Sequence, residues 1–318
     1  MNALALYRYA IPFHSAIDFN GHRLTQREGL LIRLEHDGAI AWGEAAPLPG
    51  FSRESLAEAQ AQLLLLMPAL KESDQLPEGA TLPSVRFALS SALWQLHKTH
   101  RLTHLEPTPL LAGTSQQIVD KATNIDARCL KLKVGRGSVE EEIRLIYSLL
   151  EQDPKRRFRL DANQRWTEQQ ATEFAASIPL KQVDFIEEPT PSLETNLALA
   201  ASLGLPLALD ETTQAEGYRY QPLPGVKALV LKPQLIGDLD TLAKMVDQAD
   251  HDGVKVVLSS AFESNLGLST LADLAAELTP DQSPGLDTLD ALQADLIMPA
   301  RQGVPCYSED QLECLWQG

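Results

Sequence analysis

From about residue 105 onward, short apolar segments alternate with helical stretches, and this regularity limits the possible folds more than any other feature of the chain. Short apolar segments bounded by turn residues suit buried strands. Strands that alternate with helices form βαβ units and pair in parallel. The predicted strands are Thr108–Leu111, Ala127–Val134, Arg157–Leu160, Val183–Ile186, Pro206–Leu209, Lys227–Leu231 and Lys255–Leu258.

The spacing of the predicted strand ends favours a closed barrel over an open sheet. The ends taken at Asp161, Glu187, Asp210 and Lys232 are separated by 26, 23 and 22 residues, which is one strand and one helix per step. An open doubly wound sheet more often has a glycine-rich first turn, and this sequence has none. We therefore predict an α/β fold with a (β/α)7β TIM-like barrel over residues 101–295.

The first third of the chain has a different order, with strands first and helices after them. The expected strands are Leu4–Pro12, Gly29–His36 and Ala39–Trp42, and the expected helices are Ser52–Leu66 and Ser84–His97. Runs of strands followed by runs of helices are typical of an α+β unit. Residues 1–100 are therefore predicted to form an α+β capping domain.

Two details refine this capping domain. Ser52 is the predicted N-cap of the first helix, and Ser55 and Glu58 have the spacing of a capping box. The tail that follows the last barrel strand, residues 296–318, contains Trp316, which needs apolar cover. We expect this tail to complete the capping domain.

The composition argues against two broad classes of function. With 43 acidic and 27 basic residues, the chain has a formal net charge of −16 and a pI near 4.8, so its surface repels a nucleic-acid polyanion. The spacings of Cys129, Cys306 and Cys314 fit neither a disulfide framework nor a zinc site, which indicates reduced thiols. The longest apolar run, Leu63–Met67, ends at Pro68, and no charged leader precedes an apolar stretch. We expect a cytoplasmic protein that binds neither nucleic acid nor membrane.

Charged side chains stand at or near the carboxyl ends of five consecutive predicted strands. Because strand side chains alternate between two faces, Lys131 and Lys133 share one face and the leucines beside them share the other. The same alternation places Asp161 opposite Leu160, and Lys232 opposite the leucines of its own strand. The leucines are expected to face the helices, so the charges should point into the barrel mouth, where barrel enzymes have their active sites.

Three carboxylates from adjacent strands, those of Asp161, Glu187 and Asp210, form an all-oxygen set suited to a hard cation such as Mg²⁺. Lysines flank this set, with the Lys131/Lys133 pair on the preceding strand and Lys232 on the following one. Such a site suits removal of a proton α to a carboxylate, because the resulting enolate is a dianion. General base catalysis supplies only about 3–5 kcal/mol, so a metal must supply much of the remainder.

The order of these charged residues resembles the enolase superfamily, which has a Lys-x-Lys pair after the second barrel strand, acidic ligands after the third, fourth and fifth, and a lysine after the sixth. The resemblance covers nearly the whole chain. Within that superfamily, several stretches are similar to the o-succinylbenzoate synthases. They are Gly43–Phe51, Arg159–Asn163, Ser259-Ser260 with Glu263-Ser264, and Pro284–Leu289.

The resemblance implies a Mg²⁺-dependent lyase, with Mn²⁺ as an alternative ion. It implies loss of water from 2-succinyl-6-hydroxy-2,4-cyclohexadiene-1-carboxylate to give o-succinylbenzoate for menaquinone biosynthesis, by α-proton abstraction and a metal-stabilised enolate. By the same resemblance, Lys133 is the base and then the acid, while Lys131 holds the substrate carboxylate near the metal. Lys232 would stabilise the anion from the other face by cation–π attraction.

The metal ligand within Glu187-Glu188-Pro189 is expected to be Glu187. The family ligand is the first glutamate of this motif. Independently, the two-residue period of a strand points Glu188 away from the barrel mouth.

Further substrate contacts are expected around the same mouth. They are Arg159, Asn163, Ser259, Ser260 and Gly285. The two serines and the glycine follow the last strands, where they can offer hydroxyl and backbone donors to a succinyl carboxylate. The segment Gly43–Phe51 is expected to be the lid loop over the substrate.

Other reactions compatible with this pattern remain open. A racemase of N-succinylamino acids, or a related racemase or epimerase, would use Lys133 and Lys232 as bases on opposite faces. Dipeptide epimerases typically have Asp-x-Asp after the last strand, whereas Asp287 and Asp290 have the wrong spacing. A Schiff-base lyase with a lysine nucleophile leaves the carboxylates unexplained.

Overall fold

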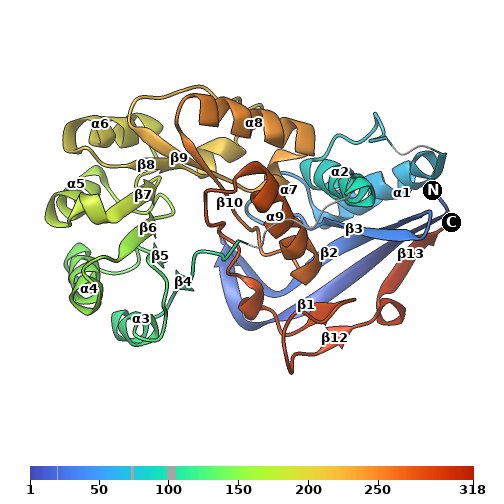
Figure 1. Cartoon of the computed structure of the whole chain (residues 1–318), viewed down its shortest axis with the longest axis horizontal. Coiled ribbons are helices and arrows are strands. Elements are labelled where there is room, and N and C mark those ends of the chain that lie inside the picture. Colours follow the sequence, from blue (N-terminus) through green and yellow to red (C-terminus); the bar gives the residue numbers. More distant parts are fainter. Residues whose placement is uncertain (20, 73–74, 99–104) are drawn as a thin grey trace.

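The computed structural model describes residues 1–19, 21–72, 75–98 and 105–318. It consists of an antiparallel sheet covered by helices, beside a curled parallel sheet surrounded by helices (Figure 1). The α/β fold with an α+β capping part is therefore confirmed. The domain boundary predicted at residue 100 lies outside the described residues.

The antiparallel sheet has the strand order β13-β1-β2-β3 and brings the two ends of the chain together. Its strands are β1 (Ala3–Phe19), β2 (His22–His36), β3 (Ala39–Ala45) and β13 (Glu313–Gln317). β1 and β2 extend beyond their predicted limits. Their pairing is interrupted after Pro12 but resumes at Ile17, so both strands continue into a second half of the hairpin. The second half of this hairpin is polar and mostly exposed, so it lacks the alternation that identifies a strand.

Helices α1 (Leu56–Glu72) and α2 (Pro83–His97) pack on this sheet. The apolar side chains of Leu6, Ile32 and Leu63 belong to one buried cluster between helices and strands. Trp316 of β13 packs against the same cluster, so the C-terminal tail shares the core of the N-terminal sheet.

The start of α1 confirms one predicted cap and contradicts the other. The Ser55 hydroxyl accepts a hydrogen bond from the Glu58 N–H, and the Glu58 carboxylate accepts one from the Ser55 N–H, at 3.2 and 2.8 Å. The prediction of Ser52 as the N-cap is wrong, because α1 begins at Leu56. The Ser52 hydroxyl instead accepts a hydrogen bond from the Leu48 N–H and closes a turn.

Within the described ranges the parallel sheet has seven strands, hydrogen-bonded in chain order from β4 to β10. These strands are β4 (Leu110–Leu111), β5 (Cys129–Lys133), β6 (Arg157–Asp161), β7 (Val183–Glu187), β8 (Leu207–Leu209), β9 (Val226–Leu231) and β10 (Lys255–Leu258). The helices of this part are α3 (Ser115–Ala122), α4 (Val139–Gln152), α5 (Glu168–Ser177), α6 (Leu193–Leu203), α7 (Pro233–Ile236), α8 (Leu239–His251) and α9 (Asn265–Leu278). After α9, β11 (Asp295–Leu296) and β12 (Cys306–Tyr307) form a small separate pair.

A single bridge around Gly285 joins the two edges of the parallel sheet and completes the ring. The Gly285 N–H donates to the Leu258 carbonyl at 2.9 Å, and the Thr108 N–H donates to the Pro284 carbonyl at 2.9 Å. A Cβ atom at Gly285 would lie 2.8 Å from the Ser259 Oγ, so a larger residue here would displace the Ser259 hydroxyl. The eighth strand of the predicted barrel is thus reduced to a bridge.

The barrel strands alternate as predicted, with aliphatic side chains outward and charged side chains inward at the strand ends. Leu132, Leu160 and Leu231 belong to the cluster shared with the surrounding helices. Phe185 and Val230 belong to a separate inner cluster. The charges at the strand ends therefore lie above an apolar floor. No helix in the described ranges has the length and apolar character needed to cross a membrane.

A buried arginine and a buried glutamate join the capping sheet to the barrel. Arg27 of β2, 1% exposed, donates to the carbonyls of Pro47 and Phe262 at 3.0 and 2.8 Å. Glu44 of β3 accepts from the backbone N–H groups of Ser264 and Gly267, both at 2.9 Å, at the start of α9. A carboxylate at a helix N-terminus satisfies otherwise unpaired N–H groups and complements the helix dipole.

Glu263 lies fully buried beside this junction, where its surroundings disfavour a charged carboxylate. Its Oε2 accepts from the Ala261 N–H, while its Oε1 has no hydrogen-bond partner in the described ranges. Burial, and then the charge of Glu44, raise the pKa of Glu263 from 4.5 to about 7. Folding therefore takes up a proton between these two pH values.

We predict that Glu263→Gln becomes more stable relative to the wild type as the pH rises from 5 to 8. Stability from the protonated Glu263 is fully present below pH 4.5 and is lost as the pH rises through about 7. The lost contribution amounts to about 3 kcal/mol, and glutamine does not ionise. Denaturant unfolding at both pH values measures the difference, with exposed Glu216→Gln as the control. A gap between Glu263→Gln and the wild type that is the same at both pH values would contradict the prediction.

Candidate functional site

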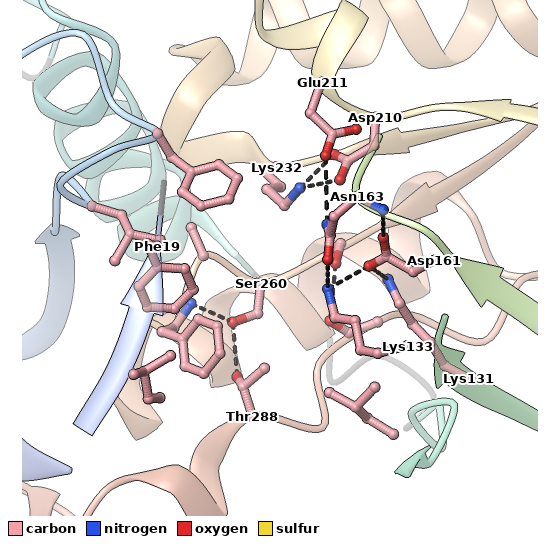
Figure 2. A pocket seen from close by; sticks show the side chains of 18 of the residues that line it. Phe19, Lys131, Lys133, Asp161, Asn163, Asp210, Glu211, Lys232, Ser260 and Thr288 are labelled. Carbon is pink, nitrogen blue, oxygen red and sulfur yellow. Dashed lines mark hydrogen bonds and ion pairs between the residues drawn. The ribbon is translucent and has the colours of Figure 1, made fainter. Parts of the chain in front are cut away.

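A cavity of about 260 Å³ opens at the carboxyl ends of the barrel strands, beneath the capping part (Figure 2). The barrel contributes Lys131, Lys133, Asp161, Asp210 and Lys232 to its lining. These side chains extend from the ends of β5, β6, β8 and β9, so the alternation read from the sequence brings them together.

Each buried carboxylate of this site is paired with a lysine ammonium. Lys131 Nζ lies 2.9 Å from each carboxylate oxygen of Glu187 and 3.3 Å from Asp161 Oδ2. Lys133 Nζ donates to Asp161 Oδ2 at 2.5 Å. Lys232 donates to both oxygens of Asp210. Figure 2 shows Lys131 and Lys133 meeting Asp161, and Lys232 meeting Asp210.

Glu187 and Glu188 point in different directions, as their positions in the strand predict. Glu187 faces Lys131 from behind the pocket wall and is 1% exposed. Glu188 instead accepts from the backbone N–H groups of Asp210 and Thr212 at 3.0 and 2.7 Å. Glu188 thus holds the loop after β8 and is not available to a ligand in the barrel mouth.

Burial and the neighbouring charges shift the pKa values of the two carboxylates Glu187 and Asp161 in opposite directions. Burial raises the pKa of Glu187 to about 8, and the neighbouring carboxylates Asp161 and Asp210 add to the rise against the opposing effect of Lys131. Burial opposes charge on Asp161 too, but Lys133 and Lys131 hold its pKa well below the usual range. Burial would lower the pKa of Lys232, yet Asp210 raises it, so Lys232 remains a cation.

The three carboxylates fit a divalent cation by their chemistry. Asp161, Glu187 and Asp210 offer oxygen ligands only, and all three are buried, which is the donor set that Mg²⁺ takes. Burial, and then the neighbouring carboxylates Asp161 and Asp210, raise the pKa of Glu187, so a cation bound beside it would favour its charged form. In the described ranges no three acidic, histidine or cysteine side chains are already arranged around one point, because lysines occupy the carboxylate oxygens.

Asn163 lies beside Lys133 in the position that the sequence suggests. Its Oδ1 accepts from Lys133 Nζ at 3.0 Å, and its backbone N–H donates to Asp161 Oδ1 at 3.1 Å. Its side-chain NH₂ lies 3.5 Å from Glu211 Oε1, an acidic residue that the sequence reasoning missed. Asn163 therefore helps to fix the direction of Lys133.

Ser259, Ser260 and Gly285 line the pocket, but their donors are already engaged. The Ser259 hydroxyl donates to the Gly285 carbonyl at 3.2 Å, and the Ser260 hydroxyl pairs with that of Thr288 at 2.8 Å. The backbone N–H groups of Ser260 and Gly285 are used in closing the barrel, and that of Ser259 donates to the Leu231 carbonyl at the end of β9. These residues therefore shape the wall of the pocket.

The structure does not bring Arg159 to the pocket. Its guanidinium donates to the Thr108 hydroxyl at 2.8 Å and to the Ser283 carbonyl at 2.6 Å, inside the barrel. Arg159 thus ties β6 to both sides of the closing bridge. Its location one pleat below Asp161, on the inward face, is the physical reason, since that depth lies under the lining.

An aromatic wall faces the charged one, and the sequence identified only part of it. Phe19, Phe51 and Phe262 line the pocket, with ring centroids 5.6 Å apart for Phe19–Phe51 and 5.1 Å apart for Phe19–Phe262. The predicted lid Gly43–Phe51 divides into the end of β3 and a loop over the pocket that supplies Leu48 and Phe51. Phe19 stands in the polar half of β1, where no local pattern marks a pocket residue.

Comparison with known proteins gives a consistent family. Residues 1–96 match the model for the MenC N-terminal domain, and residues 115–299 match the enolase C-terminal domain-like model. The chain is 38% identical to the o-succinylbenzoate synthase of Edwardsiella ictaluri over 325 aligned residues, covering 100% of both chains.

Solved structures agree with this match. The magnesium-bound o-succinylbenzoate synthase of Thermosynechococcus elongatus superposes with a TM-score of 0.72 at 25% identity, covering 89% of this chain and 92% of that one. The N-succinyl Arg/Lys racemase of Bacillus cereus superposes with a TM-score of 0.76 at 20% identity, covering 98% and 93% of the two chains. At this level of identity, the similarity to the racemase shows a shared fold only.

We predict that Glu187→Gln weakens Mg²⁺ binding by about tenfold or more, while Glu188→Gln changes it by less than about threefold. The first substitution removes a carboxylate from the expected set of ligands, and the second alters a residue that bonds to backbone N–H groups. Calorimetric titration with Mg²⁺ measures both affinities. The larger loss in Glu188→Gln would show that the ligand has been assigned to the wrong glutamate.

Proposed function

The chain belongs to the o-succinylbenzoate synthase family of the enolase superfamily, and from this membership we propose how its site residues carry out the reaction of that family. It is a carbon–oxygen hydro-lyase of menaquinone biosynthesis. Its substrate, 2-succinyl-6-hydroxy-2,4-cyclohexadiene-1-carboxylate, loses water to give o-succinylbenzoate. The observation that supports the assignment of roles is the facing pair of lysines, Lys133 and Lys232, over buried carboxylates.

Lys133 is the proposed base and then the acid. In its neutral form its amine takes the proton from the carbon that bears the ring carboxylate, and the electron pair of that C–H bond passes into the enolate. The ammonium formed returns this proton to the leaving hydroxyl as the C–O bond breaks, so water departs and the ring becomes aromatic. Asp161 and Asn163, which lie 2.5 and 3.0 Å from Lys133 Nζ in the structure, are proposed to orient it toward that carbon.

The proposed ligands of Mg²⁺ are Asp161, Glu187 and Asp210. When bound, Mg²⁺ supplies positive charge beside the carboxylate that becomes a dianionic enolate. We propose that Mn²⁺ can replace it, since both ions accept oxygen ligands.

The remaining lysines act as charges. Lys131, which contacts both Glu187 and Asp161, is proposed to hold the ring carboxylate of the substrate beside the metal ligands. Lys232 Nζ lies over the Phe51 ring, 5.7 Å from its centre, so this ammonium group already makes a cation–π contact. We propose that it stabilises the π system of the intermediate in the same way.

A second reaction, racemisation of N-succinylamino acids, is favoured by one observation. Two lysines from different strands, β5 and β9, line the same pocket, as a two-base exchange of an α-proton requires. We propose this as a side activity.

We also propose the division of the chain and its setting in the cell. Residues 1–100 with the tail 296–318 form the capping domain, and residues 101–295 form the catalytic barrel. The three free cysteines and the acidic composition support a cytoplasmic enzyme that binds a small carboxylate and no nucleic acid.

The decisive test of the function is the loss of diene absorbance from the cyclohexadiene substrate. We expect turnover with Mg²⁺ and none after chelation, with recovery on addition of Mg²⁺ or Mn²⁺. Asp161→Asn and Asp210→Asn should remain folded and lose at least about 100-fold in kcat/KM, because each loses a charged ligand at nearly constant volume. Full activity of either variant in the presence of chelator would overturn the metal assignment.

The two lysines should respond differently to substitution. We expect Lys133→Ala to lose essentially all dehydration, whereas Lys232→Arg, which keeps a cation but cannot accept a proton near neutral pH, should retain measurable dehydration. Deuterium exchange at the α-carbon of an N-succinylamino acid checks the faces independently. Wild type should exchange both enantiomers, and each lysine variant should lose one. Interconversion of both enantiomers by folded Lys232→Arg would contradict its place on the opposite face.

A further inference from the structure

Two arginines stand on the rim of the catalytic pocket with no partner of their own. Arg136 follows β5 and Arg165 follows β6, both line the cavity and both are exposed. Within the part of the chain that the structure describes, neither guanidinium makes a hydrogen bond or an ion pair. The other cations of the lining, Lys131, Lys133 and Lys232, are all bonded to carboxylates.

The two guanidinium groups are close enough to affect each other. Partial burial and the charge of Arg165 lower the pKa of Arg136, so the cations repel one another at this rim. The charges of Asp161 and Glu142 act against this lowering, but neither carboxylate bonds to the Arg136 guanidinium, and Glu142 Oε1 accepts from the backbone N–H groups of Arg136 and Gly137 instead, at 2.8 and 3.2 Å. The N–H donors of two neighbouring guanidinium groups are therefore available to an anion.

The substrate of the proposed function offers such an anion. It is a dicarboxylate, and only its ring carboxylate is accounted for by Lys131 and the metal ligands. The succinyl carboxylate needs donors elsewhere in the pocket, because an anion removed from water without them is costly. The backbone N–H groups of Ser259, Ser260 and Gly285 and the Ser259 hydroxyl donate within the protein, and the Ser260 hydroxyl is paired with that of Thr288.

We propose, on the basis of the proposed function, that Arg136 and Arg165 bind the succinyl carboxylate and so select dicarboxylates over monocarboxylates. The planar guanidinium group matches a carboxylate with two parallel hydrogen bonds. The aromatic wall of Phe19, Phe51 and Phe262 covers the other side of the pocket, which leaves the arginine side to the charged tail. In a chain of net charge −16, this rim also gives the dianion a favourable point of entry.

The test uses two ligands that differ in one group. The first is o-succinylbenzoate, and the second is 2-butanoylbenzoate, in which a methyl group replaces the succinyl carboxylate. We expect Arg136→Gln and Arg165→Gln each to weaken o-succinylbenzoate binding by about tenfold and to leave 2-butanoylbenzoate binding within about twofold. KM for dehydration should rise by a similar factor with kcat nearly unchanged, because this carboxylate lies away from the reacting bond.

The matched control is Arg128→Gln, an exposed arginine before β5 at the opposite end of the same strand, which does not line the pocket. It makes the same change in net charge and should alter neither affinity. Equal losses for both ligands, or no loss for either, would overturn the proposal. If wild type fails to dehydrate the cyclohexadiene substrate, the proposed function fails, while the comparison of the two ligands still reports on the arginines.

Discussion

The mutual neutralisation of buried charges at the barrel mouth is the constraint on which the rest of the structure depends. Three carboxylates and three lysines are taken out of water together, and each is tolerable only because the others are present. Burial still opposes the charge of Glu187, whose pKa is raised to about 8. A divalent cation bound among the carboxylates would stabilise their charged forms and, together with the lysines, would add the positive charge that a dianionic enolate needs.

The capping part is held to this site by polar contacts as well as by packing. Arg27 reaches from β2 to the carbonyls of Pro47 in the lid loop and Phe262 beyond β10, so one side chain fixes two segments of the aromatic wall. Glu44 supplies the N-terminus of α9 with acceptors from the adjoining strand. Neither contact lies within hydrogen-bonding distance of the charged cluster, yet that of Arg27 holds the segments that carry Phe51 and Phe262.

The alternation of side chains along the strands predicts correctly which charged residues face the barrel mouth. Residues whose position depends on contacts between distant parts of the chain could not be predicted in this way. The inward charges from Lys131 to Lys232 and the choice of Glu187 over Glu188 follow from the two-residue period of a strand, and the structure places them so. Phe19 could not be found, because its hairpin is polar and its role depends on how the cap meets the barrel. Ser52 was mistaken for a helix cap because a turn of the lid loop uses the same residue type. Arg159 lies on the inward face of its strand, as predicted, but too deep in the barrel to reach the pocket.

The bridge at Gly285 makes the barrel a ring with one weak seam. Six of its junctions are ladders between named strands, while the seventh interval, from β10 back to β4, is spanned by the few hydrogen bonds around Pro284 and Gly285 in the described ranges. Arg159 braces this seam from inside the barrel. A substrate in the pocket touches both sides of it, since Lys131 and Thr108 lie on one side and Ser259 on the other. A ligand that contacts both sides would link them, so we expect the seam to be more resistant to opening when the pocket is occupied.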